Sequence, residues 1–589
     1  MKFLLAAVNA KYIHSNPGVY SLKKYAEATV PHMQTEIAEY TINHSMDQVL
    51  QDLYLRKPDI IGFSCYIWNM MEIRGLIHDL HKVLPDTDIW LGGPEVSFDA
   101  PEMLKQEPEV LGVMKGEGER TFAKLLGCYR LLGCSVRSMT NNPPGETDAD
   151  NEESRKNFWR EMHNLPGIAY RMDHGEIEDR EIRPAADLSI FPFPYEELTG
   201  FENRIIYYES SRGCPFSCSY CLSSVDKVLR FRDLELVKKE LDFFLERKVP
   251  QVKFVDRTFN CKKSHAMAIW RYILERDNGV TNFHFEVAAD LMDQEELELI
   301  GKMRQGQIQL EIGVQSTNPR TIREIRRRMD LEKVRQVVAR IHAGHNVHQH
   351  LDLIAGLPFE DYESFRHSFN EVYEMEPEQL QLGFLKVLKG SHMYEMASRY
   401  QLVYRQEAPY EVLSTRWLSY AEVIRLKGVE AMVEVYYNSG QFVNTLRLLA
   451  GRFSDAFGMF ERLAQYYEDC GWIGRNHSRL ARYEILHDFI QMLVQEPKEN
   501  EGQAGPGISM ENWEDALVCD CYLRENCKSR PGFAREQSAY KEKFRSLVPE
   551  LRSLGSQVHI EALHSGEIWL FDYRKRDPLT RNAAMIRLE

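Results

Sequence analysis

Three cysteines stand close together in the stretch Ser211-Arg-Gly-Cys-Pro-Phe-Ser-Cys-Ser-Tyr-Cys-Leu222. Cys214, Cys218 and Cys221 have the spacing C-x3-C-x2-C, which a chain of this composition would show by chance only about 0.004 times. Thiolates this close in an intracellular chain are more often metal ligands than disulfide partners. Soft thiolates favour zinc or iron–sulfur clusters, and structural zinc takes four protein ligands. A local count of three therefore favours a four-iron cluster with one iron open to a non-protein ligand, with three structural thiols as the alternative.

The motif resembles that of the radical S-adenosylmethionine (SAM) enzymes. The resemblance implies that Cys214, Cys218 and Cys221 hold a [4Fe–4S] cluster. It also implies that SAM chelates the fourth iron and is cleaved, by an electron from the cluster, to methionine and a 5′-deoxyadenosyl radical. Tyr220 stands where the family often has an aromatic residue. Gly213 suits a loop that wraps closely round a cluster.

The composition is that of an ordinary globular protein, with 43% hydrophobic and 27% charged residues. A length of 589 residues predicts two to four domains. The net charge of −15 argues against broad binding to nucleic acid or to anionic membranes, although a local basic groove stays open. The first eight residues do not make a signal peptide, and no apolar run is long enough to span a membrane. The cytoplasm is therefore the expected location.

Residues 1–140 alternate short apolar runs with amphipathic stretches, which predicts an α/β fold, a doubly wound Rossmann-like domain with a parallel sheet. The predicted strands are Lys2–Val8, Thr35–Tyr40, Ile60–Ser64, Ile89–Leu91 and Val110–Met114, and helices include Gly18–Thr29, Met46–Leu55 and Ile73–Leu84. Ligands of such sheets bind beyond the carboxyl ends of the strands. The loops at those ends are Asn9–Asn16, Cys65–Asn69, Gly92–Glu95 and Gly116–Glu119.

Three phrases in these loops resemble the N-terminal domain of the cobalamin-binding radical SAM enzymes: Asn9-Ala-Lys-Tyr-Ile-His-Ser15, Gly92-Gly-Pro-Glu-Val-Ser97 and Lys115-Gly-Glu-Gly-Glu119. The resemblance implies that a cobalamin lies on the carboxyl edge of the sheet and faces the cluster. A docking domain without a cofactor is the alternative. The implied cobalamin contacts are His14, Ser15, Asn16, Cys65, Tyr66, Trp68, Gly92, Gly93, Pro94, Glu95, Gly116 and Glu117.

The D-x-H-x-x-G signature, whose histidine ligates cobalt in other cobalamin enzymes, is missing from this sequence. Members of the radical SAM group commonly lack it too. His14 is a candidate lower axial ligand, with a hydrogen bond inside its loop or a surface position as alternatives. Residues 66–69 could cover the lower corrin face, and for Trp68 the alternative is core packing.

Residues 141–200 are expected to form a linker and a hairpin. Residues 141–157 are polar and almost devoid of apolar side chains, which predicts an exposed loop or linker. Residues Leu165–Ile182 predict a hairpin that turns at Asp173-His-Gly175.

Residues 201–398 resume the alternation of strands and helices. Strands are predicted at Ile205–Glu209, Gln251–Val255, Phe283–Val287, Gln309–Val314, His350–Ile354 and Gln381–Lys386. Six such units imply a partial (β/α)6 barrel, in which the cysteine loop follows the first strand at the catalytic mouth.

The ends of these strands match the radical SAM family piece by piece, which implies a set of SAM contacts. They are Tyr220, Asp256, Glu286, Glu311, Gln315, Ser316, Asp352 and Leu388. For Glu286 and Glu311 the alternative is a structural pair with an arginine. The turn Lys389–His392 departs from the family pattern and leaves the adenine contacts open.

Two other groups of residues have competing interpretations. Arg326–Arg328 is either a solvated helix end or a site for phosphate or for the SAM carboxylate. The spacing of His342, His345, His348 and His350 fits no metal motif and favours surface or barrel packing.

Residues 399–589 are predicted to be mostly helical, with helices over 410–427 and 442–464 and a break over 497–509. They resemble a helical C-terminal extension found on a subset of these enzymes, whose role the family does not settle. Cys519, Cys521 and Cys527 are either ligands of a second cluster or structural thiols.

The resemblance implies a cobalamin-dependent radical SAM methyltransferase that acts on an unactivated carbon or phosphinate centre of a small molecule or peptide. An external flavodoxin- or ferredoxin-type protein would supply electrons. A non-methylating rearrangement, cyclisation or oxidation with the same cofactors is the alternative. An RNA-binding or tRNA-modifying module is a third hypothesis, which the acidic net charge disfavours.

Overall fold

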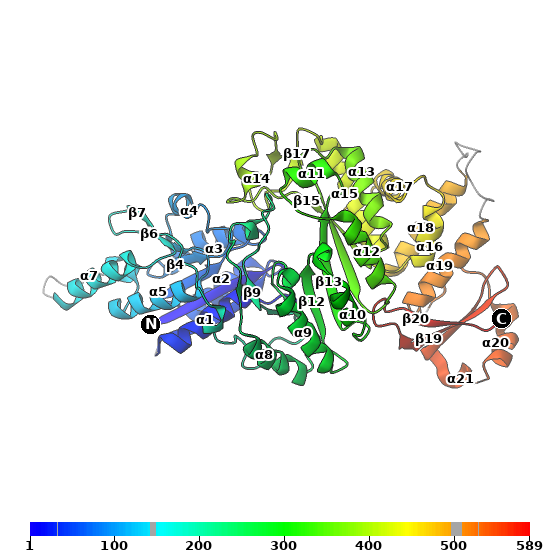
Figure 1. Ribbon diagram of the computed structural model, residues 1–589, viewed down its shortest axis with the longest axis horizontal. Helices are drawn as coiled ribbons and strands as arrows, with labels where there is room; N and C mark the ends of the chain where they lie inside the picture. The colour runs from blue at the N-terminus through cyan, green and yellow to red at the C-terminus, as the bar shows by residue number, and fades with distance from the viewer. Residues whose placement is uncertain (32, 142–148, 496–508, 528, 550) are drawn as a thin grey trace. The chain divides into compact units, whose positions relative to one another are not determined.

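The structure is a computed structural model that describes residues 1–31, 33–141, 149–495, 509–527, 529–549 and 551–589 (Figure 1). The chain forms two compact units. The first consists of residues 1–287, 325–327 and 386–412, and the second of residues 288–324, 328–385 and 413–589. These limits differ from the four predicted segments, whose boundaries stay a prediction.

A seven-stranded sheet occupies the N-terminal part of the first unit, in the order β2-β1-β3-β4-β5-β6-β7. Its first five strands are parallel, as the sequence predicts. They are β1 Lys2–Asn9, β2 Gln34–Thr41, β3 Ile60–Ser64, β4 Asp88–Gly92 and β5 Val110–Met114. The helices that follow them are α1 Pro17–Thr29, α2 Met46–Arg56, α3 Met70–Val83, α4 Ala100–Gln106 and α5 Glu119–Leu132.

Two buried clusters cover the two faces of this sheet. Alternate residues of β1 enter different clusters: Leu4 and Ala6 pack with α2, α3 and α4, whereas Phe3 and Leu5 pack with α1 and α5. Successive side chains of a strand point to opposite faces, so a strand buried on both faces is apolar throughout. Helices occupy both faces, and ligands of such sheets bind toward the carboxyl ends of the strands.

The segment predicted as a linker is helical where the structure describes it, so this prediction is wrong for residues 149–157. Helix α6 spans Val136–Asn141 and α7 spans Ala149–His163, and residues 142–148 lie outside the described residues. Helix α7 packs on the core through two buried side chains, Phe158 and Met162. Both come just after the polar run, so the run by itself predicted an exposed linker. The predicted hairpin is present as β6 Ile168–Arg171 and β7 Ile177–Asp179, and β6 extends the sheet by pairing with β5.

Three further parallel strands belong to the first unit: β8 Ile206–Tyr208, β11 Gln251–Phe254 and β12 Asn282–Val287. Helices α8 Leu234–Glu246 and α9 Lys263–Glu275 connect them. The cysteine loop follows β8, and the short antiparallel pair β9 Ser211–Arg212 and β10 Arg230–Phe231 closes it. The first unit also contains α14 His392–Glu395 and β16 Val403–Tyr404.

The second unit holds three further parallel strands: β13 Ile308–Gln315, β14 His348–Ala355 and β15 Gln379–Phe384. Helices α10 Gln294–Ile300, α11 Pro319–Glu324, α12 Leu331–His342 and α13 Tyr362–Tyr373 accompany them. Alternate residues of β13 are buried, so Glu311 and Gln315 share its polar face. The six predicted strands of this region are therefore all present, three in each unit.

The C-terminal region is mostly helical, as predicted. Its helices are α15 Tyr420–Met432, α16 Val443–Ala450, α17 Ala456–Asp469, α18 Arg479–Gln495, α19 Met510–Arg524, α20 Lys541–Leu547 and α21 Leu551–Leu554. An antiparallel sheet of β18 Val558–Ala562, β19 Ile568–Arg576 and β20 Ala583–Arg587 was not predicted. All but the last residue of the predicted break over 497–509 lie outside the described residues.

Two predicted helices of this region differ from the observed ones. The helix predicted over 410–427 begins only at Tyr420, because Val412–Ser414 is strand β17 and Ser419 caps the helix. The helix predicted over 442–464 is divided, because Asp455 caps a new helix, α17, with its carboxylate.

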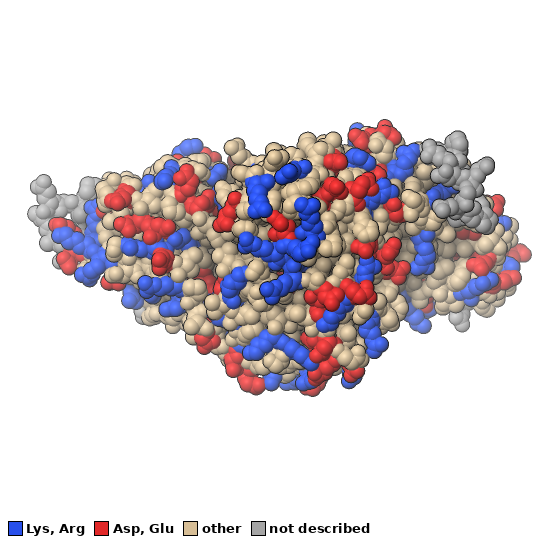
Figure 2. Space-filling model, turned by 45° about the horizontal axis from the view of Figure 1, so that its top comes forward, with Lys and Arg blue, Asp and Glu red and all other residues tan. Residues whose placement is uncertain are grey.

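In the part of the chain that the structure describes, no helix has both the length and the apolar character that a membrane crossing needs. Acidic and basic side chains are interspersed over the face shown in Figure 2.

Candidate functional site

The three cysteines lie on one loop of the first unit. Cys214 and Cys218 are buried, and Cys221 is half-buried. A tight turn joins the last two, since the Cys221 N–H donates to the Cys218 carbonyl (3.2 Å). Gly213 has φ +94°, and a Cβ there would lie 2.3 Å from the Val228 carbonyl oxygen, so only glycine fits before the first cysteine.

Residues distant in sequence hold this loop in place. The Ser219 N–H donates to the Ile325 carbonyl (2.8 Å), and the Ser219 carbonyl accepts from the Met393 N–H (2.7 Å). The buried Asp256 accepts from the Ser210 N–H (2.9 Å) and from the Ser211 hydroxyl (2.5 Å). Burial raises the pKa of Asp256 to about 6. The structure therefore places Asp256, predicted as a SAM contact, where it anchors the start of the cysteine loop.

Arg327 brings a positive charge to the cysteine loop. Its Nη1 lies 3.9 Å from Cys218 Sγ and 3.4 Å from the Tyr220 hydroxyl. Burial raises the pKa of the Cys218 thiol, and Arg327 opposes this shift. A cation beside a thiol favours the thiolate, which is the form that ligates iron. Of the two interpretations of Arg326–Arg328, neither anticipated this contact, because the partner lies more than a hundred residues away in sequence.

The separation of the thiols favours a cluster over a single ion. Tetrahedral zinc, with Zn–S bonds of about 2.3 Å, brings its sulfur ligands to roughly 3.8 Å from one another. Among the described residues, the His, Cys, Asp and Glu groups whose ligand atoms lie within 4.8 Å of one another do not include the three cysteines. At least two of the three thiols are therefore farther apart than the sulfur ligands of one zinc ion would be, which agrees with a [4Fe–4S] cluster in which each thiolate binds a different iron.

A cavity of about 370 Å³ opens at the carboxyl ends of the parallel strands of the first unit. This volume is in the range of small-molecule sites. Leu222 and Ser223, directly after Cys221, line the same cavity as the N-terminal sheet. The other lining residues are mostly glycine or apolar: Leu5, Gly18, Val19, Leu22, Gly62, Phe63, Ser64, Tyr66, Gly92, Gly93, Pro94, Ser97, Phe98, Met114, Gly116 and Gly118. Such a glycine-rich, apolar lining fits a bulky, flat cofactor such as a corrinoid.

Only some of the predicted cobalamin contacts line this cavity: Tyr66, Gly92, Gly93, Pro94 and Gly116. The others, His14, Ser15, Asn16, Cys65, Trp68, Glu95 and Glu117, are not among the lining residues. Gly93 has φ +111°, and a Cβ there would lie 2.4 Å from the Cys65 carbonyl oxygen. The apolar floor of the cavity, formed by Val19, Phe63 and Met114, was not predicted. In the sequence these residues have the pattern of ordinary core residues.

Ser97 was also missed, although it belongs to the phrase that carried the resemblance. Its hydroxyl donates to the Gly93 carbonyl (2.7 Å) and accepts from the Gly116 N–H (3.2 Å). The hydroxyl therefore fixes two glycine turns of the cavity rim relative to each other.

The loop after β1 is bound to the segment around β8. His14 Nδ1 lies 2.6 Å from the Tyr207 hydroxyl, and the Ser15 hydroxyl donates to the Ile205 carbonyl (3.0 Å). The Asn16 carboxamide lies 2.9 Å from the Ser64 hydroxyl. Burial, with Lys11 and Lys253 nearby, lowers the pKa of His14. The His14 ring therefore bonds to a residue outside its own loop, a partner that the sequence interpretations did not name.

Trp68 is neither a lining residue nor a core residue. It is 40% exposed, and its indole stacks on Tyr66 with ring centroids 4.3 Å apart. The indole N–H donates to the Val8 carbonyl (3.3 Å). Trp68 thus supports Tyr66, which does line the cavity. Cys65, the residue before Tyr66, is fully buried.

Glu95 and Glu117 hold parts of the first unit together. Glu95 accepts a hydrogen bond from the Tyr410 hydroxyl. Glu117 pairs with Arg230 and lies 3.5 Å from Arg212, the residue two positions before the first cysteine. Arg212 also pairs with Glu119 (2.8 Å). The Lys115–Glu119 loop is therefore linked by ion pairs to the cysteine loop.

The predicted SAM contacts are distributed over both units. Tyr220, Asp256, Glu286 and Leu388 belong to the first, and Glu311, Gln315, Ser316 and Asp352 to the second. Glu286 lies half-buried on β12. The Leu388 carbonyl accepts from the Ser391 hydroxyl (2.6 Å), which forms a tight turn after β15.

In the second unit, Glu311, His350 and Asp352 present ligand atoms that all lie within 4.8 Å of one another. His350 Nε2 is 3.1 Å from Asp352 Oδ1. Strand pairing causes this convergence, since Glu311 and His350 are register partners on β13 and β14. The sequence assigned His350 to packing, because periodicity along one strand does not reveal a partner on the next.

Gln315 and Ser316 stand at the end of β13. Gln315 adopts φ +74° beside a β-bulge, an unusual conformation for a non-glycine residue. The Ser316 hydroxyl donates to the buried carboxyl of Glu360 (2.7 Å), which also accepts from the Ser368 hydroxyl (2.9 Å). Ser316 is therefore held by a carboxyl group that sequence reasoning did not select.

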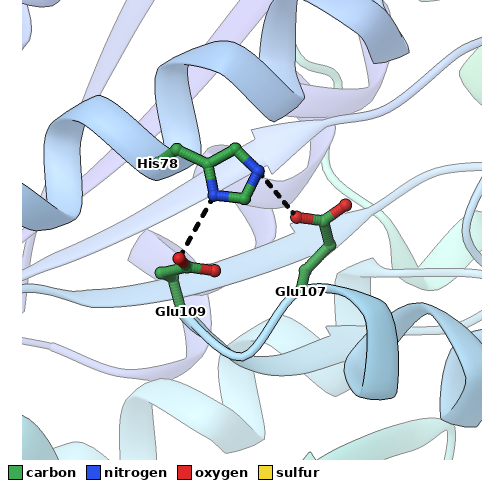
Figure 3. A group of neighbouring side chains, drawn as sticks. All are labelled: His78, Glu107 and Glu109. Carbon is green, nitrogen blue, oxygen red and sulfur yellow. Dashed lines mark hydrogen bonds and ion pairs between the residues drawn. The ribbon is translucent and has the colours of Figure 1, made fainter.

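Figure 3 shows another group, in which the His78 ring lies between Glu107 and Glu109. His78 Nε2 is 3.3 Å from Glu107 and Nδ1 is 3.2 Å from Glu109. Arg74 Nε also lies 3.2 Å from Glu107. A guanidinium already compensates the buried carboxylate, so these residues form an ion-pair network at the amino end of β5, away from the cavity.

Three family models match the chain. A B12 binding domain matches residues 4–126, the radical SAM superfamily matches residues 208–372, and a protein family of unknown function, DUF4080, matches residues 398–565. The first match contains the strands that line the cavity, and the second begins just before the cysteine loop. The chain therefore combines a B12 binding domain with a radical SAM domain.

Curated relatives of this B12-binding radical SAM protein include enzymes of two reaction types. A 2-(S-pantetheinyl)-carbapenam-3-carboxylate methyltransferase of Streptantibioticus cattleyicolor is 27% identical over 54% of this chain and 45% of its own length. An anaerobic magnesium-protoporphyrin IX monomethyl ester cyclase of Rubrivivax gelatinosus is 22% identical over 57% of each chain. The chain spans about half the length of the curated relatives it matches.

Two solved structures share the fold. The radical SAM methyltransferase TsrM from Kitasatospora setae, with cobalamin and a [4Fe–4S] cluster bound, has a TM-score of 0.53 and 16% identity over 69% of this chain and 79% of its own. The cobalamin-dependent SAM radical enzyme OxsB with aqua-cobalamin has a TM-score of 0.58 and 13% identity over 94% of this chain and 81% of its own. At these identities the likeness concerns the fold alone.

Proposed function

We propose that this protein is a cobalamin-dependent radical SAM methyltransferase that methylates an unactivated carbon of a small molecule or peptide. The observation that carries the proposal is the shared cavity: Leu222 and Ser223 of the cysteine loop line the same space as Gly92, Gly93 and Gly116 of the B12-binding domain. Two reactive cofactors at one cavity can act on one bound substrate, because positioning replaces collision. The name of the carbapenam methyltransferase relative adds support for methyl transfer.

When bound, the cluster with SAM supplies a radical able to take hydrogen from a carbon that lacks acidity, and cobalamin supplies the methyl group. Cys214, Cys218 and Cys221 would hold the cluster. Gly92, Gly93 and Gly116 would let the backbone approach the corrinoid, and the apolar floor would exclude water.

The remaining parts of the proposal concern SAM and the electron supply. The carboxylates of Glu311 and Asp352 suit the positively charged amino group of SAM, because charge-assisted hydrogen bonds are the strongest kind available. We assign the electron supply to an external flavodoxin or ferredoxin, and the location to the cytoplasm.

A non-methylating reaction with the same cofactors is the second candidate. The match to a magnesium-protoporphyrin IX monomethyl ester cyclase favours it, because that match covers 57% of each chain.

The deciding experiment uses full-length protein reconstituted anaerobically with iron, sulfide and cobalamin, then mixed with SAM and titanium(III) citrate. Chromatography quantifies 5′-deoxyadenosine and S-adenosylhomocysteine, and the visible spectrum follows the corrinoid. Methyl transfer requires both products, with one equivalent of S-adenosylhomocysteine per bound cobalamin as a minimum. Sustained release of 5′-deoxyadenosine with no S-adenosylhomocysteine would favour the second candidate, and failure to bind cobalamin would refute both.

Cys214→Ala, Cys218→Ala and Cys221→Ala are the matched controls. Each is expected to abolish 5′-deoxyadenosine formation and to lower the iron content to background. Each should retain cobalamin affinity within about tenfold, because the other lining residues of the cavity all come from the B12 binding domain.

A further inference from the structure

Two thiols that the proposed function does not use lie in contact in the second unit. Cys521 Sγ and Cys527 Sγ are 3.3 Å apart. Cys521 is fully buried near the end of α19, and Cys527 is half-buried in the segment that follows. Cys519 stands two residues earlier on the same helix, and positions i and i+2 do not face each other. The three cysteines therefore do not converge as the ligands of a second cluster would have to.

The turn between the two thiols is fixed by contacts that do not involve sulfur. The Glu525 N–H donates to the Cys521 carbonyl (2.7 Å), and the Glu525 carboxylate accepts from Arg479 Nε of α18 (2.8 Å). The Glu525 carbonyl accepts from the Tyr573 hydroxyl of β19 (3.2 Å). The side chain of Asn526 donates to the Ser556 carbonyl (2.8 Å). The residues on the N-terminal side of Cys527 are thus tied to three other segments of the unit, and the fold itself places Cys527 against Cys521.

This arrangement has a chemical consequence. Two thiols held in contact by the fold have already lost the conformational freedom that opposes ring closure, so their effective concentration toward each other is high. Rotation of the two cysteine side chains is the only movement needed to bring the sulfur atoms from contact to an S–S bond. The half-buried Cys527 is the thiol that a small reagent can reach, and the buried Cys521 is the thiol placed to resolve the adduct.

We propose that Cys521 and Cys527 are a redox-active dithiol, a modification site at which a low-molecular-weight disulfide oxidises the pair to an intramolecular disulfide. The Cys527 thiolate attacks one sulfur of the reagent, which releases the first small thiol and leaves a mixed disulfide. The Cys521 thiolate then attacks the Cys527 sulfur and releases the second small thiol. The protein loses two protons and two electrons, and the reagent gains them as two thiols. This inference does not depend on the proposed methyl transfer.

The test uses full-length protein with its cluster in place, so that Cys214, Cys218 and Cys221 are ligated. Anaerobic protein is incubated with glutathione disulfide, acid-quenched, alkylated and mapped by mass spectrometry. The expected product is a peptide joined between Cys521 and Cys527, about 2 Da lighter than the dithiol and restored by dithiothreitol. The exposed Cys470 serves as an internal control, since it should stop at a glutathione adduct.

Single substitutions separate the two roles. Cys521→Ser should leave Cys527 as a stable glutathione adduct, and Cys527→Ser should leave Cys521 unmodified because it is buried. Cys519→Ser should form the disulfide as the wild type does. The proposal is overturned if Cys521 and Cys527 stay reduced while Cys470 is modified, or if Cys521 bonds to Cys519 instead.

Discussion

At the scale of single residues, the cluster loop depends on side chains that its motif does not contain. Arg327 contacts Cys218 and Tyr220, and Asp256 binds Ser210 and Ser211. Arg327 places a positive charge beside the thiols, and Asp256 fixes the position of the start of the loop. Both act on the thiolates from outside the C-x3-C-x2-C spacing, so each can be altered without removing a ligand.

Removal of the Arg327 charge should change the reduction potential of the cluster. Reduction adds an electron, and a nearby cation stabilises the more negative state, so Arg327→Met should lower the potential by roughly 50 mV. Arg327→Lys keeps the charge and should give a smaller shift. The measurement is a redox titration followed by electron paramagnetic resonance (EPR). An unchanged potential in the methionine variant would show that the guanidinium does not influence the cluster.

His14 should prove dispensable for cobalt ligation. Its pKa is lowered, so the ring is neutral at pH 7, and the Tyr207 hydroxyl occupies Nδ1. His14 is also not among the residues that line the cavity of the B12-binding domain. His14→Ala should leave the EPR spectrum of bound cob(II)alamin unchanged. Loss of a nitrogen hyperfine splitting in the variant would identify His14 as the lower ligand after all.

The sequence predicted residues whose identity follows from local chemistry, and it failed where a partner comes from afar. The three cysteines and the glycines at 92, 93 and 116 could be proposed from the sequence, because a cluster ligand must be a thiolate and a close backbone approach needs glycine; their roles stay a prediction. Arg327, Ser97 and His350 were missed, because their roles arise from contacts with residues that only the folded chain brings near.

At the scale of elements, strand pairing and helix caps place the polar groups. In the second unit, β13 ends in a bulge at Gln315, and the next residue, Ser316, binds the buried Glu360 just before α13. A buried carboxyl that accepts two hydroxyl hydrogen bonds and whose pKa is raised by burial makes the stability of this junction depend on pH.

Glu360→Gln should flatten that pH dependence. Burial raises the pKa of Glu360 to about 7 from 4.5. The folded state therefore keeps a proton that the unfolded chain releases, so the free energy of unfolding falls as the pH rises from about 4.5 to about 7. The loss is at most about 3 kcal/mol. Glutamine mimics the protonated form and should lose less stability between pH 5 and pH 8 in urea titrations. Parallel curves for the two proteins would contradict this assignment.

A helix or strand could be predicted where its own residues repeat apolar side chains at the period of that structure. Four of the five parallel strands of residues 1–140 came out within a few residues because strands buried on both faces are apolar throughout. The edge strand β2 is mostly polar and was predicted from the alternation of strands and helices instead. Helix α7 was missed because its apolar anchors follow a polar run, and β18–β20 were missed because the preceding helical pattern was extended over them.

At the scale of the whole molecule, the chain returns to the first unit after it has contributed to the second. Residues 386–412 belong with residues 1–287, and they bring Lys389 to within 2.6 Å of Asp99 and the Tyr410 hydroxyl to Glu95. A boundary drawn between residues 398 and 399 would divide this segment. Local composition gives no sign of such a return, which is why the predicted boundaries do not match the compact units.

Tyr410→Phe should therefore destabilise the N-terminal sheet from a distance of more than three hundred residues in sequence. The change removes the donor to the buried Glu95, and an unsatisfied buried acceptor costs about 1–3 kcal/mol. The expected result is a lower unfolding free energy of the first unit, with the iron content retained. Tyr394→Phe, at an exposed position of the same segment, is the control. Equal stability of the two variants would contradict the proposed role of this contact.

The hydrogen bonds of Ser219 to Ile325 and Met393 also bear on how the protein is made. A ribosome adds about 5–20 residues per second, so roughly 10 to 35 s pass between the emergence of Cys221 and that of Met393. During this interval the nascent cysteine motif lacks the segments that fix it. We therefore expect the iron–sulfur cluster to be inserted late in biosynthesis, and the three thiols to be open to oxidation before that if translation takes place in air.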